Sequence, residues 1–143
     1  MRRNTRLDPP PPSRPELALV AEDHIEDGIY LRHILTRQGL IVRTAMDGLQ
    51  AVKLVRAEAF DLVLMDVSMP RMDGVSAVRA IRDIERAEGR TPAYIQMTTG
   101  FGEMEDMAWS IEAGADGHMV KPLSVRAVLE VLHQARIHRG AVV

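Results

Sequence analysis

Three acidic side chains in this sequence stand where chemistry is expected, directly after apolar runs of strand length. Glu22 and Asp23 follow the run 17–21, and Asp66 follows the run 62–65. In open α/β sheets, ligands bind outside the carboxyl ends of the strands. Carboxylates that meet there repel one another, so we expect a compensating cation. Mg²⁺ (or Mn²⁺) is such an ion, because it binds a few carboxylates and keeps several waters.

Two more polar side chains end later apolar runs. Lys121 offers an ammonium that can bind a phosphoryl oxygen or a carboxylate, and Thr98 offers a hydroxyl donor. Thr99 could do the same, but alternation along a strand points it to the opposite side. A crevice that combines a carboxylate nucleophile, a metal site, a hydroxyl and an ammonium suits phosphoryl transfer onto a carboxylate.

Strand-like and helix-like patterns alternate five times along the chain. The expected strands cover residues 17–21, 40–45, 62–65, 93–98 and 116–120. The expected helices cover residues 25–38, 51–59, 75–87, 103–113 and, after a Ser124 cap, the stretch to 138. This alternation predicts an α/β fold, a flavodoxin-like doubly wound (βα)5 domain with a five-stranded parallel sheet in the order 2-1-3-4-5. In that order the first and third strands are neighbours, so their acids converge.

The loop after Asp66 also carries a pattern. The run 62–65 has no charge, which is typical of a central strand buried on both faces. Pro70 and the pair Asp73-Gly74 then restrict the backbone of the following loop. We therefore expect the single acid to emerge from the core into a loop of defined shape.

Composition excludes several classes of function. The 143 residues suit one domain, and the net charge of -2 gives no basic surplus for direct binding to nucleic acid. The absence of cysteine excludes thiol catalysis and cysteine-based zinc sites. No apolar run approaches the roughly 18 residues of a membrane span, so we expect a cytoplasmic protein without a membrane partner. Residues 1–15 read as a disordered Arg/Pro-rich tail or linker before a domain over residues 16–140.

Together these motifs resemble the receiver domain of two-component response regulators. The similarity spans about residues 16–138. Each motif alone is a weak signal, but the order and spacing of the whole set are typical of the family. The motifs are Glu22-Asp23, Asp66-Val-Ser-Met-Pro70, Asp73-Gly74, Thr98, Gly114-Ala-Asp116 and Lys121-Pro122.

The resemblance implies roles for these residues. Asp66 would accept a phosphoryl group from a histidine kinase or a histidine phosphotransfer protein. Thr98 and Lys121 would contact the phosphoryl oxygens. The implied metal ligands are Glu22 through water, Asp23, Asp66 and the backbone carbonyl of Ser68.

The resemblance also implies a switch. Phosphorylation would pull Thr98 inward and change the surface of the fourth helix, fifth strand and fifth helix, which would bind a downstream protein target or a second copy in a homodimer. The family usually has Tyr or Phe three residues before the lysine, whereas this chain has His118. We expect His118 to act as the switch residue on the partner face, since an imidazole can change rotamer and titrate near neutral pH. The alternative is a strand histidine without that role.

The only tryptophan, Trp109, lies in the fourth predicted helix. Met104, Ala108 and Ile111 form the expected buried stripe of that helix, which leaves Trp109 exposed as an interface anchor on the partner face. Core packing of Trp109 is the alternative.

The favoured function is thus a phosphorylation-dependent signalling switch rather than an enzyme, either free-standing and chemotaxis-regulator-like or the receiver of a hybrid kinase. We expect no catalytic or DNA-binding output module after His138. One alternative is an aspartyl-nucleophile phosphatase of the haloacid dehalogenase type, which needs a second acid two positions after the nucleophile, where Ser68 stands. Another is a receiver-shaped docking module that is never phosphorylated, although its complete set of polar residues argues against that.

Overall fold

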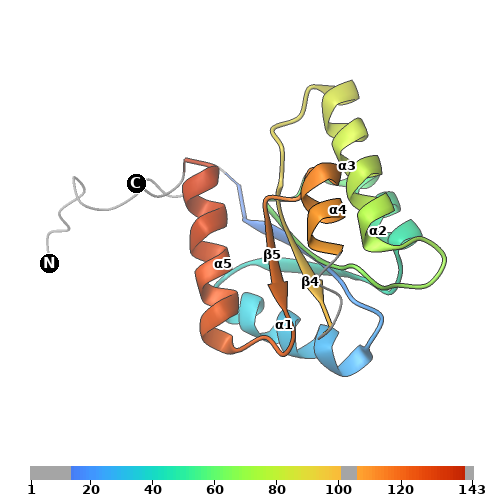
Figure 1. Cartoon of the computed structure of the whole chain (residues 1–143). Coiled ribbons are helices and arrows are strands. Elements are labelled where there is room, and N and C mark those ends of the chain that lie inside the picture. The colour runs from blue at the N-terminus through green and yellow to red at the C-terminus, as the bar shows by residue number, and fades with distance from the viewer. Residues whose placement is uncertain (1–13, 101–105, 141–143) are drawn as a thin grey trace, which may run out of the picture.

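Five strands alternate with five helices over the described part of the chain (Figure 1). The computed structural model describes residues 14–100 and 106–140, and the side chains of residues 106 and 107 lie outside that description. The strands are β1 (Leu17–Ala21), β2 (Ile41–Ala45), β3 (Leu62–Asp66), β4 (Tyr94–Thr99) and β5 (Gly117–Val120). The helices are α1 (Ile25–Arg37), α2 (Gly48–Ala57), α3 (Gly74–Glu88), α4 (Asp106–Ala113) and α5 (Val125–His138).

All five strands are parallel and stand in the order β2-β1-β3-β4-β5. The flavodoxin-like (βα)5 prediction is confirmed. Chain order reverses between β1 and β3, and their carboxyl ends lie side by side there, with Ala21 opposite Met65. This reversal is the place where a doubly wound sheet leaves a crevice.

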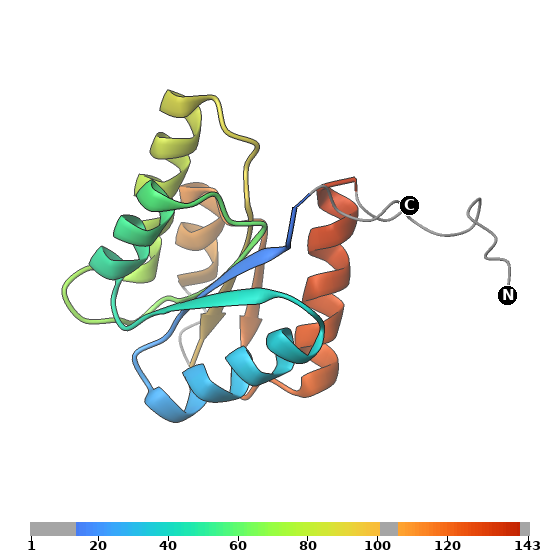
Figure 2. The same cartoon turned by 180° about the vertical axis from the view of Figure 1, so that it is seen from behind.

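Two hydrophobic cores hold the sheet between its helices. Helices α1 and α5 cover one face, and helices α2, α3 and α4 cover the other, as the two opposite views show (Figures 1 and 2). Strand β3 is buried along its whole length, as predicted for a central strand. Leu62 and Leu64 pack toward α1 and α5, whereas Val63 and Met65 pack toward the other face. Each fully buried aliphatic side chain contributes about 1.5–3 kcal/mol, so packing holds the strand that ends in Asp66.

Side chains at the helix starts fix most of the boundaries. In each case an oxygen accepts a hydrogen bond from a backbone N–H of the first turn, which would otherwise lack a partner. The three caps are Asp47 for α2, Asp73 for α3 and Ser124 for α5. The Ser124 cap was predicted. The sequence also placed the end of the fourth strand at residue 98, but β4 continues through Thr99, whose carbonyl accepts a hydrogen bond from the Lys121 N–H (2.7 Å).

The fourth helix differs from its prediction. Ile111 is 59% exposed and Ala108 is exposed as well, so the expected buried stripe is wrong for these two residues, and Met104 lies outside the described residues. Ala113 and Ser110 are buried instead. The fourth helix is short and packs at its end, so its spacing alone did not reveal the buried face. Trp109 is 58% exposed, which confirms that part of the prediction.

The chain enters the domain beside the end of α5. Arg14 donates two hydrogen bonds to the buried carboxylate of Asp61 (2.8 and 3.0 Å), and Arg139 pairs with the same carboxylate (2.7 Å). Glu16 accepts two hydrogen bonds from Arg136 of α5. The predicted tail therefore includes one residue, Arg14, that is anchored, and residues 1–13 lie outside the described residues.

Candidate functional site

The acids that sequence placed at strand ends meet at the reversal of strand order. Asp66 is the last residue of β3, and Glu22 directly follows β1, where its N–H donates to the Ala45 carbonyl (3.0 Å). Both residues are buried, with 4% and 3% of their surfaces exposed, whereas Asp23 is half-buried. A buried acid is costly unless it is paired or protonated, so this site needs a compensating charge.

Lys121 supplies a positive charge to both acids. Its Nζ lies 3.0 Å from Oδ2 of Asp66 and also donates a hydrogen bond to Glu22. Asp27 of α1 lies 3.9 Å from the same ammonium. Strand β5 is separated from β3 by β4, so the long lysine side chain must reach across the end of β4 to make these contacts. The peptide bond between Lys121 and Pro122 is cis.

Burial and charge perturb the protonation of this group. Burial, together with the hydrogen bond to Asp66, raises the pKa of Glu22 to about 8. Desolvation opposes the charge of Lys121, but its hydrogen bonds to Glu22 and Asp66 raise the pKa of the ammonium above its usual value. The site therefore binds a proton on Glu22 more tightly than an exposed glutamate would, and Lys121 remains charged.

The loop after β3 holds Asp66 from its other side. Ser68 N–H donates to Oδ1 of Asp66 (3.1 Å), and Gly74 N–H donates to the Val67 carbonyl (2.8 Å). A Cβ on Gly74 would lie 2.1 Å from the Asp66 carbonyl oxygen, closer than any side chain can approach. The Asp-Gly pair in the sequence therefore marks a place where α3 begins in direct contact with the backbone of the acid.

The same loop also rests on the start of α2. Gly48 N–H donates to the Met72 carbonyl (3.0 Å), and a Cβ on Gly48 would lie 2.2 Å from that oxygen. Arg71 has a left-handed backbone with φ of 68°, and its guanidinium lies 3.6 Å from the carboxylate of Asp47. An Asp-Gly pair such as Asp47-Gly48 is typical of a turn or a helix cap, and this local pattern does not reveal the support of the loop.

Two adjacent threonines face opposite sides of the sheet. Thr98 pairs in register with Asp66 and Met119, so these three side chains share the face toward α1 and α5. Thr99 lies on the other face, which it shares with Met97 and His118. The Thr99 hydroxyl is buried and has no hydrogen-bond partner among the described residues. The sequence assigned both phosphoryl contact and switching to Thr98, but only Thr99 shares a face with the half-buried His118.

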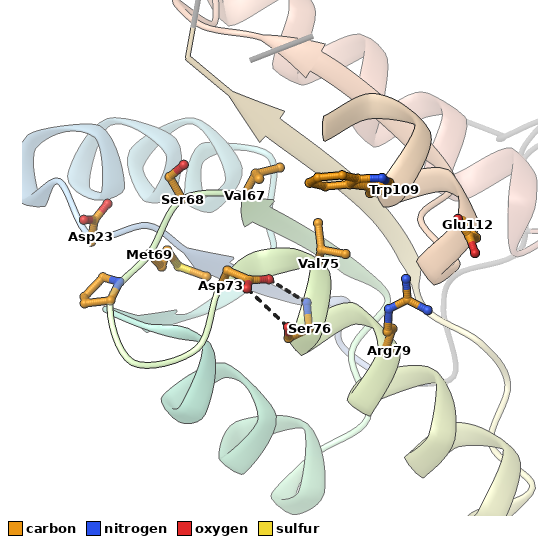
Figure 3. Close-up of a pocket in the computed structure, with 11 residues that line it drawn as sticks. Asp23, Val67, Ser68, Met69, Asp73, Val75, Ser76, Arg79, Trp109 and Glu112 are labelled. Carbon is orange, nitrogen blue, oxygen red and sulfur yellow. Dashed lines mark hydrogen bonds between the residues drawn. The ribbon is translucent and has the colours of Figure 1, made fainter. Parts of the chain in front are cut away.

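An open groove of about 930 Å³ runs away from the acids between the start of α3 and helix α4. Figure 3 shows Asp23 and Ser68 at one end of this groove and Arg79 with Glu112 at the other, with the Trp109 ring between them. The predicted interface residue Trp109 therefore lies beside the α3 start, whereas His118 lies in β5, a different element of the expected partner face.

The donor set fits a divalent cation. Glu22, Asp23, His24 and Asp66 each offer one ligand atom, and these four atoms lie within 4.8 Å of one another. Oδ1 of Asp23 is buried and accepts no hydrogen bond from the described residues. A hard divalent cation binds carboxylate oxygens, so an ion at this position would bind Oδ1 of Asp23 together with the neighbouring carboxylate oxygens. Sequence reasoning did not include His24, and the run Glu-Asp-His was the signal that it passed over.

Residues 18–133 match the family model of the response regulator receiver domain. This chain belongs to the response regulator receiver family. The receiver is 33% identical over 126 residues to the sensor protein GacS of Pseudomonas syringae, which covers 88% of this chain and only 14% of GacS. It is 32% identical over 117 residues to the chemotaxis protein CheY of Bacillus subtilis, which covers 81% of this chain and 93% of CheY.

Solved receivers have the same fold. The receiver domain of the sensor histidine kinase PA1611 from Pseudomonas aeruginosa, which has a magnesium ion coordinated in its active-site cleft, matches with a TM-score of 0.74 and 26% identity over 89% of this chain and 99% of that one. The Ssk1 receiver of Saccharomyces cerevisiae, crystallised with the phosphotransfer protein Ypd1, matches with a TM-score of 0.82 and 21% identity over 90% and 93% of the two chains. The chain is thus a receiver of two-component signal transduction. None of the helices described here is both long and apolar enough to cross a membrane.

Proposed function

We propose that this receiver is a phosphorylation switch that accepts a phosphoryl group on Asp66 from a histidine kinase or a histidine phosphotransfer protein. The observation that carries the proposal is the contact of Lys121 Nζ with Oδ2 of Asp66 (3.0 Å) at the reversal of strand order. A carboxylate that is held on both oxygens and meets a fixed ammonium is arranged for nucleophilic attack on phosphorus.

The transfer step forms one bond and breaks one. A carboxylate oxygen of Asp66 attacks the phosphorus of the donor phosphohistidine, the new P–O bond forms, and the P–N bond breaks with its electron pair remaining on the imidazole nitrogen. Lys121 moves its hydrogen bond from Asp66 to a phosphoryl oxygen, and the Ser68 N–H stays directed at the acid. Little movement is needed, because these donors already face the carboxylate.

Mg²⁺ or Mn²⁺ would be held by Asp23, Asp66 and the Ser68 carbonyl, with Glu22 acting through water. The bound ion would neutralise charge on the transferring phosphoryl group. Oδ1 of Asp23, which accepts no hydrogen bond from the described residues, and the close approach of the acidic oxygens support this ligand set. The solved PA1611 receiver with its magnesium ion is a related precedent.

The proposed output is a change of the surface formed by α4, β5 and α5, which would bind a downstream protein or a second copy of the chain. From the sequence, the hydroxyl that moves on phosphorylation is expected to be that of Thr98, whose side chain lies on the same face of the sheet as Asp66. The face that Thr99 shares with His118, and a Thr99 hydroxyl without a hydrogen bond to any described residue, support Thr99 as the group that couples to His118. We therefore propose Thr98 as the hydroxyl that lines the phosphoryl site, and Thr99 with His118 as the switching pair.

Incubation with acetyl phosphate and Mg²⁺, followed by intact mass measurement, tests the function. We expect the parent to gain the mass of one phosphoryl group, Asp66→Asn to gain none, and the control Asp83→Asn, an exposed acid of α3, to behave as the parent. An unlabelled parent would favour a docking module that is never phosphorylated. Steady turnover of a generic phosphate ester would favour the aspartyl phosphatase.

A further inference from the structure

His24 occupies the N-cap position of α1 without capping the helix. Its backbone is extended, as in other N-caps, but its side chain accepts no hydrogen bond from the first turn. Histidine is not among the residues that N-cap positions prefer, whereas α2, α3 and α5 are all capped by Asp or Ser. The imidazole is 73% exposed and turns toward the acids instead. A residue type that local structural preference disfavours at its position often has a functional role there.

The distances from this imidazole suit shared coordination. Its Nδ1 lies 3.5 Å from Oδ1 of Asp23 and 3.8 Å from Oε2 of Glu22. Two ligand atoms that each lie about 2.0–2.2 Å from one metal ion are separated by roughly 3 to 4 Å, depending on the angle between them. Both separations fall in that range. The imidazole and Oδ1 of Asp23 are therefore spaced so that both can bind one ion.

We propose that His24 is a nitrogen ligand of the divalent-cation site, which gives this receiver a preference for imidazole-binding transition metals over Mg²⁺. This inference rests on the proposed function, because it uses the same acidic site. Mg²⁺ takes oxygen ligands almost exclusively, whereas imidazole suits Zn²⁺, Cu²⁺, Fe²⁺ and Ni²⁺. A site with the carboxylates of Asp23 and Asp66 and one imidazole should still bind Mg²⁺, but only the transition metals gain from the nitrogen.

A competing explanation makes a different prediction. If His24 only balances the charge of Asp23 and Glu22 as an imidazolium, it opposes every cation equally. Replacement by asparagine would then strengthen Mg²⁺ and Ni²⁺ binding by the same factor. If His24 is a ligand, the replacement weakens Ni²⁺ binding at least about tenfold and changes Mg²⁺ binding little.

Calorimetric titration of untagged, full-length protein with Ni²⁺ and with Mg²⁺ separates these cases. The variants are His24→Asn, which keeps a residue that can cap α1, and the control His33→Asn, an exposed histidine of the same helix. Asp23→Asn should bind neither Ni²⁺ nor Mg²⁺ at this site. Any Ni²⁺ binding that remains in this variant therefore comes from other parts of the protein. We expect the ratio of Ni²⁺ to Mg²⁺ affinity to fall at least about tenfold in His24→Asn alone.

Pulsed electron paramagnetic resonance of bound Mn²⁺ gives a readout that does not depend on affinity. Coupling of the manganese spin to a ¹⁴N nucleus should be present in the parent and in His33→Asn, and absent in His24→Asn. An unchanged affinity ratio, or ¹⁴N coupling that persists in His24→Asn, would overturn the role of His24. Failure of the parent to bind Mg²⁺ and to be labelled by acetyl phosphate would instead overturn the proposed function.

Discussion

Replacement of Glu22 by glutamine should remove most of the pH dependence that the site imposes on folding. Burial raises the pKa of Glu22 from 4.5 to about 8. At about 1.4 kcal/mol for each pH unit, this difference between folded and unfolded chains corresponds to as much as about 5 kcal/mol. Domains are stable by only about 5–15 kcal/mol, so a contribution of this order from one buried acid would be visible in the pH profile of the metal-free protein.

The direction of the effect follows from where the proton binds. Below about pH 4.5 both folded and unfolded chains hold the proton, and the full stabilisation is present. As the pH rises toward 8, the unfolded chain loses its proton first, so the stability that Glu22 contributes falls. Glutamine has no proton to lose. The free energy of unfolding of Glu22→Gln should therefore increase relative to the parent, by several kcal/mol between pH 5 and pH 8.

Urea unfolding followed by far-ultraviolet circular dichroism, in EDTA at pH 5, 6, 7 and 8, measures this difference. Glu130→Gln, a replacement of an exposed glutamate of α5, is the matched control and should follow the parent at every pH. The reasoning would be refuted by parallel pH profiles of Glu22→Gln and the parent. That result would mean that Glu22 is ionised in the folded state at neutral pH.

Three further predictions concern the loop and the switch. Gly74→Ala should lower the free energy of unfolding by about 3 kcal/mol or more, measured in urea, because its methyl group would overlap the Asp66 carbonyl. Thr99→Val should raise that free energy by about 1 kcal/mol, since it removes a buried hydroxyl that has no hydrogen-bond partner among the described residues. An equal gain in Thr98→Val would contradict the different roles proposed for the two threonines. His118→Ala should keep acetyl phosphate labelling and weaken phosphorylation-dependent binding of the partner; equal binding by variant and parent would exclude the switch role.

Local pattern was enough to predict the architecture. The uncharged run 62–65 is a buried strand, and the alternation of apolar segments with helical spacing specifies a parallel sheet with helices on both faces. Right-handed crossovers leave few strand orders for such a sheet, so the convergence of Glu22 and Asp66 follows from the sequence pattern. Capping chemistry behaved in the same local way, as Ser124 shows.

Other features depend on contacts between segments distant in sequence. Ile111 of α4 was predicted to be buried, but it is exposed. The buried face of a short helix depends on which elements pack against it, and the spacing of its apolar residues does not specify those elements. The support of the Asp66 loop by Gly48 was not visible either, since it arises where the start of α2 meets the Met72 carbonyl. Such approaches are decided by the packing of whole elements.

The sequence by itself determined the fold class, the strand order and the set of polar residues at the strand ends, because these follow from periodicity and chain connectivity. Only the tertiary structure decided how the polar residues share the site. It joined Lys121 to both buried acids, brought His118 onto the sheet face of Thr99, and turned the His24 imidazole toward Asp23. The physical reason is that side-chain direction, burial and charge pairing depend on neighbours brought together in space, and the order of residues specifies those neighbours only through the completed fold.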